Sequence, residues 1–348
     1  MNDSSQDGRS PPPARRPATR VVTAGRDPKS YHGFVNPPVY HASTMLYPSA
    51  EDFLAHRARY QYGRRGTPTT EALELALQEI EGGNCAGVSL LPSGLAAIST
   101  ALLSVVQAGD HVLVTDSAYS PTRNYCEGIL KRLGVTTSYF DPLIGGGIAE
   151  QFRPNTRAVF VESPGSLTFE MQDVTATAKV AHDKGATVLM DNTWATPLFY
   201  RALDFGVDLS IQAGTKYIGG HSDLMLGTVS ANSATVASLK NTVRLSGLCE
   251  GPDDVYLGLR GLRTLAVRLD RHYASGVRCG ALAGAAAGSV AHTAPGAGKP
   301  SGSRTVEARF HRRFGPVQRG AQAGAAAGGV CFPRYARIVR HRRVVGRF

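Results

Sequence analysis

The residue best suited to covalent chemistry in this sequence is Lys216, which closely follows an apolar segment at residues 207–211. If that segment is a strand, the lysine lies at its carboxyl end, where open α/β sheets bind their ligands. A desolvated lysine there loses part of its preference for the charged form, and a neutral amine can condense with an aldehyde. A solvated loop lysine would have the same local sequence, so the choice depends on the residues placed beside it.

Asp191 directly follows a second apolar run, residues 187–190. A carboxylate buried at a strand end needs a cationic or hydrogen-bonding partner, and the protonated ring nitrogen of a cofactor would serve. A helix cap is the structural alternative.

Two further segments could bind an anion. In the turn Pro92-Ser93-Gly94, the glycine would let backbone N–H groups approach a single phosphate at a helix N-terminus. The motifs for dinucleotides and for nucleoside triphosphates are both absent. In Tyr62-Gly63-Arg64, an arginine fork and a tyrosine hydroxyl also suit phosphate. A packing turn and a surface loop are the structural alternatives.

Strand and helix patterns alternate through the middle of the chain, which predicts an α/β fold with a mostly parallel sheet and helices on both faces. The expected strands are residues 87–91, 111–115, 135–140, 157–161, 187–191, 207–212 and 226–230. The expected helices are residues 70–81, 94–107, 121–133, 173–184 and 234–246.

Composition divides the 348 residues into four parts. Residues 1–20 are expected to be a disordered leader, 21–65 an N-terminal arm, and 66–276 the large domain. Residues 277–348 hold twelve Arg, one Lys and one acid, Glu307, so their net charge is +12. Because the whole chain has a net charge of +11, residues 1–276 carry −1. A basic interaction tail is one explanation. We favour a shifted reading frame, because GC-rich codons read out of frame yield Arg, Ala, Gly and Pro.

Several classes of protein are not expected. The near-neutral body argues against a nucleic-acid partner, and no apolar run is long enough to cross a bilayer or to act as a signal peptide. The five cysteines lack metal-ligand spacing, so we expect free thiols and no metal site. The predicted location is the cytoplasm.

Several short motifs, taken together in their order along the chain, are specific enough to indicate one protein family. Together they resemble the Cys/Met-metabolism family of pyridoxal-phosphate enzymes, of fold type I (the aspartate aminotransferase-like transferase fold), and look most like its bacterial cystathionine β-lyase branch. The similarity runs from about Val22 to Tyr273. The motifs that carry it are Tyr62-Gly63-Arg64, Ser93-Gly94-Leu95, Asp116-Ser117-Ala118-Tyr119, Glu162-Ser163-Pro164-Gly165-Ser166, Asp191-Asn192-Thr193-Trp194, Thr215-Lys216-Tyr217 and Gly220-His221-Ser222-Asp223.

The resemblance implies a role for each matching residue. Lys216 matches the lysine that forms the Schiff base with pyridoxal 5′-phosphate, and Asp191 the acid paired with the pyridine nitrogen. Gly94 and Leu95 would supply backbone donors, and Thr215 a hydroxyl, to the phosphate. Tyr119 would stack on the ring. Tyr62 and Arg64 would reach the site of a neighbouring subunit, which implies a homotetramer built from dimers.

The implied activity is cleavage of cystathionine to homocysteine, pyruvate and ammonia, a step of transsulfuration and methionine biosynthesis. Lys216, Tyr119 and Tyr62 would be its catalytic residues. A cystathionine γ-synthase or γ-lyase, and a general cysteine-S-conjugate β-lyase, remain alternatives. So, from other classes, do a catalytically impaired cofactor-binding remnant and a non-catalytic protein whose basic tail binds nucleic acid.

The family's smaller C-terminal domain is not recognisable. Its Ser-Trp-Gly-Gly-like segment and its arginine for the substrate carboxylate have no counterpart, because Trp194 is the single tryptophan and no arginine of the last 72 residues stands in a matching context. Many relatives also have Ser where this chain has Ala213. We therefore expect that domain to be missing or scrambled and the activity of this polypeptide to be weak.

Overall fold

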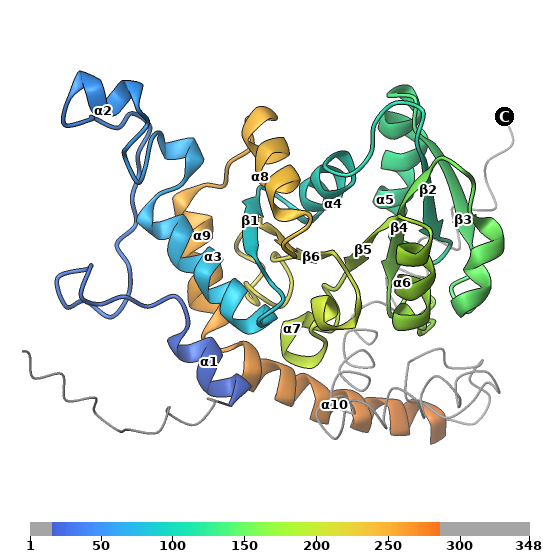
Figure 1. The fold of residues 1–348 in the computed structure, drawn as a ribbon. Coiled ribbons are helices and arrows are strands. Elements are labelled where there is room, and N and C mark those ends of the chain that lie inside the picture. Colours follow the sequence, from blue (N-terminus) through green and yellow to red (C-terminus); the bar gives the residue numbers. More distant parts are fainter. Residues whose placement is uncertain (1–15, 286–348) are drawn as a thin grey trace, which may run out of the picture.

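A computed structural model describes residues 16–285 of the chain. Most of the expected tail and most of the expected leader lie outside these residues. The arm, the sheet and its helices lie within them (Figure 1).

A seven-stranded mixed sheet forms the centre of the molecule, in the order β1-β7-β6-β5-β4-β2-β3. Among these strands only β7 runs antiparallel to its neighbours, so the carboxyl ends of the other six meet at one edge. The strands are β1 (Gly87–Leu91), β2 (His111–Thr115), β3 (Thr136–Phe140), β4 (Thr156–Glu162), β5 (Thr187–Asp191), β6 (Leu209–Ala213) and β7 (Gly227–Ala231). This confirms the predicted mostly parallel sheet.

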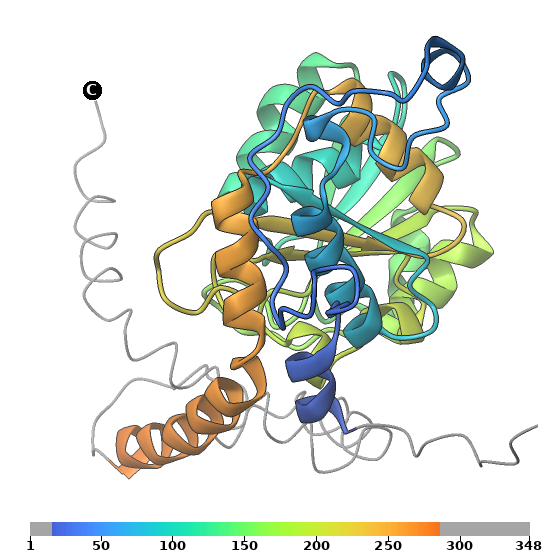
Figure 2. The same cartoon turned by 90° about the vertical axis from the view of Figure 1, so that its left-hand side faces the viewer.

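Helices cover both faces of the sheet (Figures 1 and 2). Buried residues of α3, α6 and α9 pack on one face, and those of α4, α8 and the α5 region pack on the other. The helices are α1 (Pro17–Thr23), α2 (Ala50–Leu54), α3 (Pro68–Glu81), α4 (Gly94–Leu103), α5 (Ser120–Tyr125), α6 (Val174–Asp183), α7 (Thr196–Phe199), α8 (Val236–Leu245), α9 (Pro252–Leu262) and α10 (Leu265–Ala285).

Local sequence explains where several helices begin and end. Thr67 caps α3 by exchanging hydrogen bonds with Thr70, and Gly82 ends it at a φ of 103°. The expected helix over residues 121–133 is interrupted, because α5 passes into a π-helical turn at Cys126–Leu130. The helix expected to reach residue 107 ends at Leu103.

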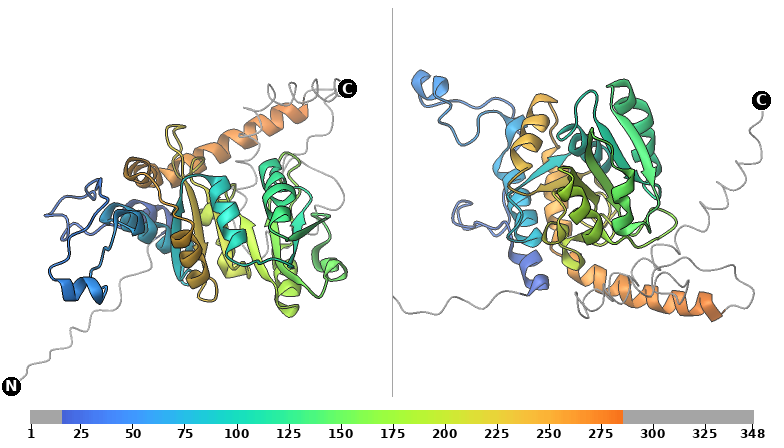
Figure 3. Two further views of the ribbon diagram at one scale, coloured as in Figure 1. Left: turned by 90° about the horizontal axis from the view of Figure 1, so that it is seen from above. Right: turned by 45° about the vertical axis from the view of Figure 1, so that its right-hand side comes forward.

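Both ends of the described chain differ from the expected boundaries. The first helix begins at Pro17, so residues 17–20 are helical rather than part of a disordered leader. Two helices that the sequence pattern did not predict, α9 and α10, follow α8, and α10 continues past residue 276 to Ala285. Figure 2 shows α10 projecting from the body, and the left view of Figure 3 shows the arm with α2 extending away from the sheet.

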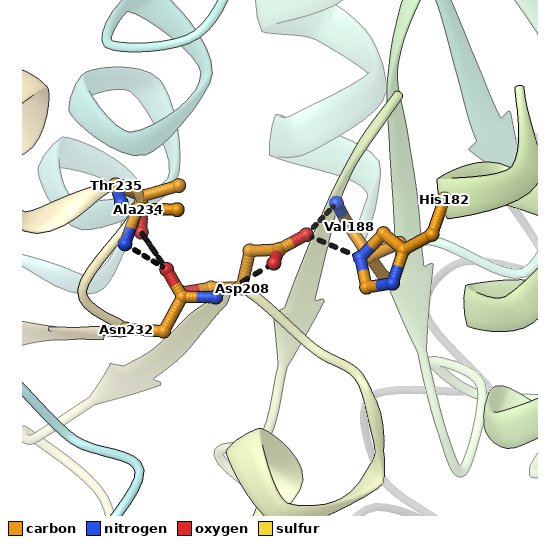
Figure 4. Close-up of polar contacts among 6 residues, drawn as sticks. All are labelled: His182, Val188, Asp208, Asn232, Ala234 and Thr235. Atoms are coloured by element: carbon orange, nitrogen blue, oxygen red, sulfur yellow. Dashed lines mark hydrogen bonds and ion pairs between the residues drawn. The ribbon is translucent and has the colours of Figure 1, made fainter. Parts of the chain in front are cut away.

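A buried carboxylate joins β5, β6 and β7 at the edge of the sheet opposite the carboxyl ends of the six parallel strands (Figure 4). Asp208 accepts hydrogen bonds from the Val188 backbone N–H at 2.7 Å, from His182 Nε2 at 2.9 Å and from Asn232 Nδ2 at 2.7 Å. The Val188 N–H is buried and would otherwise lack a partner. The network also fixes the start of β6 relative to β5 and β7.

A second acid, Glu81, lies fully buried at the end of α3. Its Oε1 accepts from Ser210 Oγ at 3.2 Å and from Gln212 Nε2 at 3.3 Å, both on β6. Its Oε2 is buried without a hydrogen-bond partner among the described residues. Burial raises the pKa of Glu81 to about 7, because an ionised carboxylate is poorly solvated there.

Three cysteines, Cys85, Cys126 and Cys249, are free thiols, as predicted. The other two lie outside the part of the chain whose side chains are described. Between residues 16 and 285, no helix is both long and apolar enough to cross a membrane.

Candidate active site

The carboxyl edge of the sheet brings together most of the residues predicted to do chemistry. Asp191 is the last residue of β5, as expected, and Lys216 lies in the turn that follows β6. Because β5 and β6 are parallel neighbours, their ends lie side by side. The Thr193 hydroxyl accepts the Ala213 N–H at 2.8 Å and so ties the two strand ends together.

The start of α4 provides two unused backbone donors at this edge. Ser93 caps the helix by accepting the Ala96 N–H at 3.0 Å. The N–H groups of Gly94 and Leu95 have no acceptor among the described residues, and they carry the positive end of the helix dipole. An oxyanion is the natural acceptor for such a pair.

Gly94 is needed for the close contact between α4 and β6. A Cβ atom on Gly94 would lie 2.6 Å from the Cβ and 3.0 Å from the Cα of Ala213. A side chain there would push the helix start away from the strand that leads to Lys216. The absence of a side chain therefore places the two amides beside the lysine turn.

Two carboxyl groups meet where β4 and β5 end. Glu162 and Asp191 are directly paired in the register of these strands. Burial raises the pKa of both groups, and the charge of Asp191 raises that of Glu162 further. Neither acid forms an ion pair with a described Lys, Arg or His. The pair therefore lacks a cation, which a protonated pyridine nitrogen would supply.

Tyr119 joins this group through its backbone. Its N–H donates to Glu162 Oε2 at 2.8 Å, and α5 begins at the next residue. Its side chain is 47% exposed, which leaves the ring available to a ligand. Tyr119, Glu162 and Asp191 are far apart in sequence, and the order of β2, β4 and β5 brings them together.

The side chain of Thr215 forms two hydrogen bonds within the described chain. Its hydroxyl donates to the Leu226 carbonyl at 3.2 Å and accepts the Leu226 N–H at 3.1 Å. Donation of this hydroxyl to a phosphate would require the bond to Leu226 O to break. The structure therefore gives Thr215 a role in holding the lysine turn against the start of β7.

Lys216 is exposed in this chain. Its turn is supported by Arg268 of α10, whose Nη2 donates to the Ile218 carbonyl at 3.3 Å and to the Gly261 carbonyl at 2.8 Å. This contact could not be predicted from the sequence, since an arginine in a helix is usually solvated.

Tyr62 and Arg64 lie apart from the residues at the carboxyl edge of the sheet. These strand-edge residues are Gly94, Leu95, Tyr119, Glu162, Asp191 and Lys216. Arg64 Nη1 donates to the Arg244 carbonyl at the end of α8 at 2.9 Å, and Tyr62 is 43% exposed. No hydrogen bond or ion pair within residues 16–285 links either residue to the lysine turn. Both line an open recess of about 230 Å³ in the arm, together with Tyr47, Phe53, His56, Gln61 and Arg65.

The strand-edge residues fit pyridoxal phosphate by their donor types. Free amides at the start of α4 suit the phosphate, the cation-free acid pair suits the ring nitrogen, and Lys216 supplies the amine. The sequence alone assigns no role to Glu162, because the contact of its side chain with Tyr119 depends on the order of the strands.

Comparison with known proteins agrees with this fit. Residues 18–282 match the family model described as Cys/Met metabolism PLP-dependent enzyme. The solved structure of metB from Corynebacterium glutamicum has a TM-score of 0.80, with 28% identity, and covers 86% of this chain and 77% of that chain.

Curated relatives are more similar in sequence. A Rhizobium johnstonii protein, provisionally named a cystathionine beta-lyase, is 56% identical over 257 residues, which are 74% of this chain and 64% of the relative's length. The cystathionine beta-lyase MetC of Escherichia coli is 45% identical over 75% of this chain and 67% of its own. The L-methionine gamma-lyase of Pseudomonas putida is 35% identical over 74% and 66%.

The chain therefore belongs to the Cys/Met metabolism family of enzymes, whose cofactor is pyridoxal phosphate.

Proposed function

We propose that this protein is a pyridoxal-phosphate-dependent carbon–sulfur β-lyase that cleaves cystathionine to homocysteine, pyruvate and ammonia. The observation that carries the proposal is the cation-free acid pair, Glu162 and Asp191, beside the lysine turn and the unused amides of α4. The names of several relatives, such as the E. coli enzyme, support cystathionine as the substrate.

Asp191, Lys216 and Tyr119 have different roles in the proposed reaction. When bound, the cofactor supplies an electron sink for the electrons released at the substrate Cα. Asp191 keeps the pyridine nitrogen protonated by its negative charge. The Nζ of Lys216 would hold the cofactor until the substrate amine takes its place, and the freed amine would then accept the Cα proton. Either Lys216 Nζ or the Tyr119 hydroxyl returns a proton to the departing sulfur.

The strand-edge amides and the arm would position the cofactor. The Gly94 and Leu95 N–H groups would bind the phosphate, and the Tyr119 ring would pack on the pyridine ring. Tyr62 and Arg64 would act on the site of a second subunit, which suits their position in the recess of the arm, away from the lysine turn of their own chain. We propose a homotetramer built from such dimers. Light scattering that gave the mass of a single chain would contradict this assembly. The cytoplasmic location and the place in methionine biosynthesis stay predictions.

The product identifies the reaction. We expect the full chain, supplied with pyridoxal phosphate and cystathionine, to release pyruvate, because elimination at Cβ leaves a three-carbon product. Chromatography of the 2-oxo acids, with and without cofactor, measures this directly. Release of 2-oxobutyrate would instead indicate γ-elimination, the reaction suggested by the name of the P. putida relative. Cofactor binding without either product would support a cofactor-binding remnant.

A further inference from the structure

The acid pair at the ends of β4 and β5 holds two chemically similar groups in different surroundings. Asp191 Oδ1 accepts the Thr193 N–H at 2.9 Å, within its own strand-end turn. Glu162 Oε2 accepts the Tyr119 N–H at 2.8 Å, from the start of α5. The two side chains thus accept hydrogen bonds from different segments, although their backbones are directly in register.

The two carboxyl groups cannot both be ionised without cost. They are adjacent, poorly solvated and free of ion pairs within the described residues, and like charges in such a place force one group to keep its proton. The backbone and side chain of Thr193 both lower the pKa of Asp191 and so favour its ionised form. Glu162 has the single bond from Tyr119 to oppose its burial and the charge of Asp191.

A bound cofactor would keep this order. The positive ring nitrogen would pair with Asp191, so that Glu162 would face a nearly neutral pair in a site from which the cofactor excludes water. The repulsion from Asp191 would be offset, whereas burial, the larger of the two causes that keep the proton on Glu162, would remain.

We propose that Glu162 is a neutral, protonated positioning residue, which fixes Tyr119 by accepting its backbone N–H, while Asp191 alone supplies negative charge to the cofactor ring. The inference rests on the proposed function for the role of Tyr119. It assigns the two acids of one pair to separate tasks, one geometric and one electrostatic.

The same chemical change at the two positions distinguishes these tasks. Glu162→Gln keeps the size, the neutrality and the acceptor for Tyr119 N–H. Asp191→Asn removes the charge that the ring nitrogen needs. Glu162→Leu keeps much of the volume but removes the acceptor, and thermal unfolding of this variant shows whether it still folds.

Titration of the cofactor-free full chain with pyridoxal phosphate, followed by absorbance, measures the effect without turnover. We expect Glu162→Gln to bind within about 3-fold of the unmodified chain and Asp191→Asn to bind at least about 10-fold more weakly, as loss of a charged hydrogen bond predicts. Equal weakening by both amides would overturn the proposal, since it would mean that Glu162 must be ionised.

A second measurement needs no cofactor. Infrared spectra of the unmodified chain and of Glu162→Gln should differ by the band of one protonated carboxyl group near neutral pH. A difference in the carboxylate bands instead would contradict a neutral Glu162. Failure of the unmodified chain to bind pyridoxal phosphate would overturn the proposed function, whereas the infrared result would still decide the protonation state of Glu162.

Discussion

Replacing Lys216 with alanine is expected to lower the rate of pyruvate release from cystathionine by at least about 10³-fold, because the variant loses both the amine that holds the cofactor and the base that accepts the Cα proton. The turn itself should survive, since Lys216 is exposed and its backbone contacts do not depend on the side chain. Initial rates with saturating pyridoxal phosphate measure the loss.

A matched control uses another exposed lysine. Lys184 follows α6 at the opposite edge of the sheet. Lys184→Ala should therefore keep the full rate. If Lys216→Ala retained more than about a tenth of the rate of the unmodified chain, a contribution of the usual size for a catalytic base would be excluded.

Replacing Glu81 with glutamine is expected to remove a pH dependence of stability worth about 3 kcal/mol. In the unfolded chain Glu81 loses its proton near the ordinary value of 4.5, whereas in the folded chain burial raises its pKa to about 7. Between these values the unfolded state has released the proton and the folded state still holds it. The stabilising contribution is therefore complete below pH 4.5 and is lost as the pH rises through 7.

Urea unfolding of both proteins at pH 5 and pH 8 measures this effect as a difference. The free energy of unfolding of Glu81→Gln, relative to that of the unmodified chain, should grow by about 2.5 kcal/mol between the two pH values, because an amide resembles the protonated acid at every pH. Other carboxyl groups with raised pKa values, such as Glu162, cancel in the comparison. Glu79→Gln, an exposed neighbour on α3, is the control and should show no such growth. An unchanged difference for Glu81→Gln would mean that Glu81 is ionised in the folded chain.

The sequence predicted the sheet well, for a physical reason. β1, β2 and β5 begin and end at the predicted residues, because strands buried on both faces form continuous apolar runs. Asp191 and Lys216 could be placed at the carboxyl edge on the same grounds. The helices α9 and α10 were missed, although Pro252 at the first turn and the spacing of Val255, Leu259 and Leu262 are typical of a helix.

Contacts between distant segments could not be predicted in this way. The bond from Tyr119 to Glu162 depends on β2 lying beside β4, and strand order is not encoded in local periodicity. The hydroxyl of Thr215 is engaged because β7 runs antiparallel to β6 and brings Leu226 to the lysine turn. The π-helical turn at Cys126–Leu130 likewise has no counterpart in the apolar pattern.

Borohydride reduction of the full chain in the presence of pyridoxal phosphate, followed by peptide mass mapping, tests the central claim most directly. Reduction makes the bond between the cofactor and a lysine permanent, so the modified residue can be identified. We expect one reduced cofactor per chain, on the peptide that contains Lys216. Attachment spread over several surface lysines, or its absence from Lys216, would contradict it.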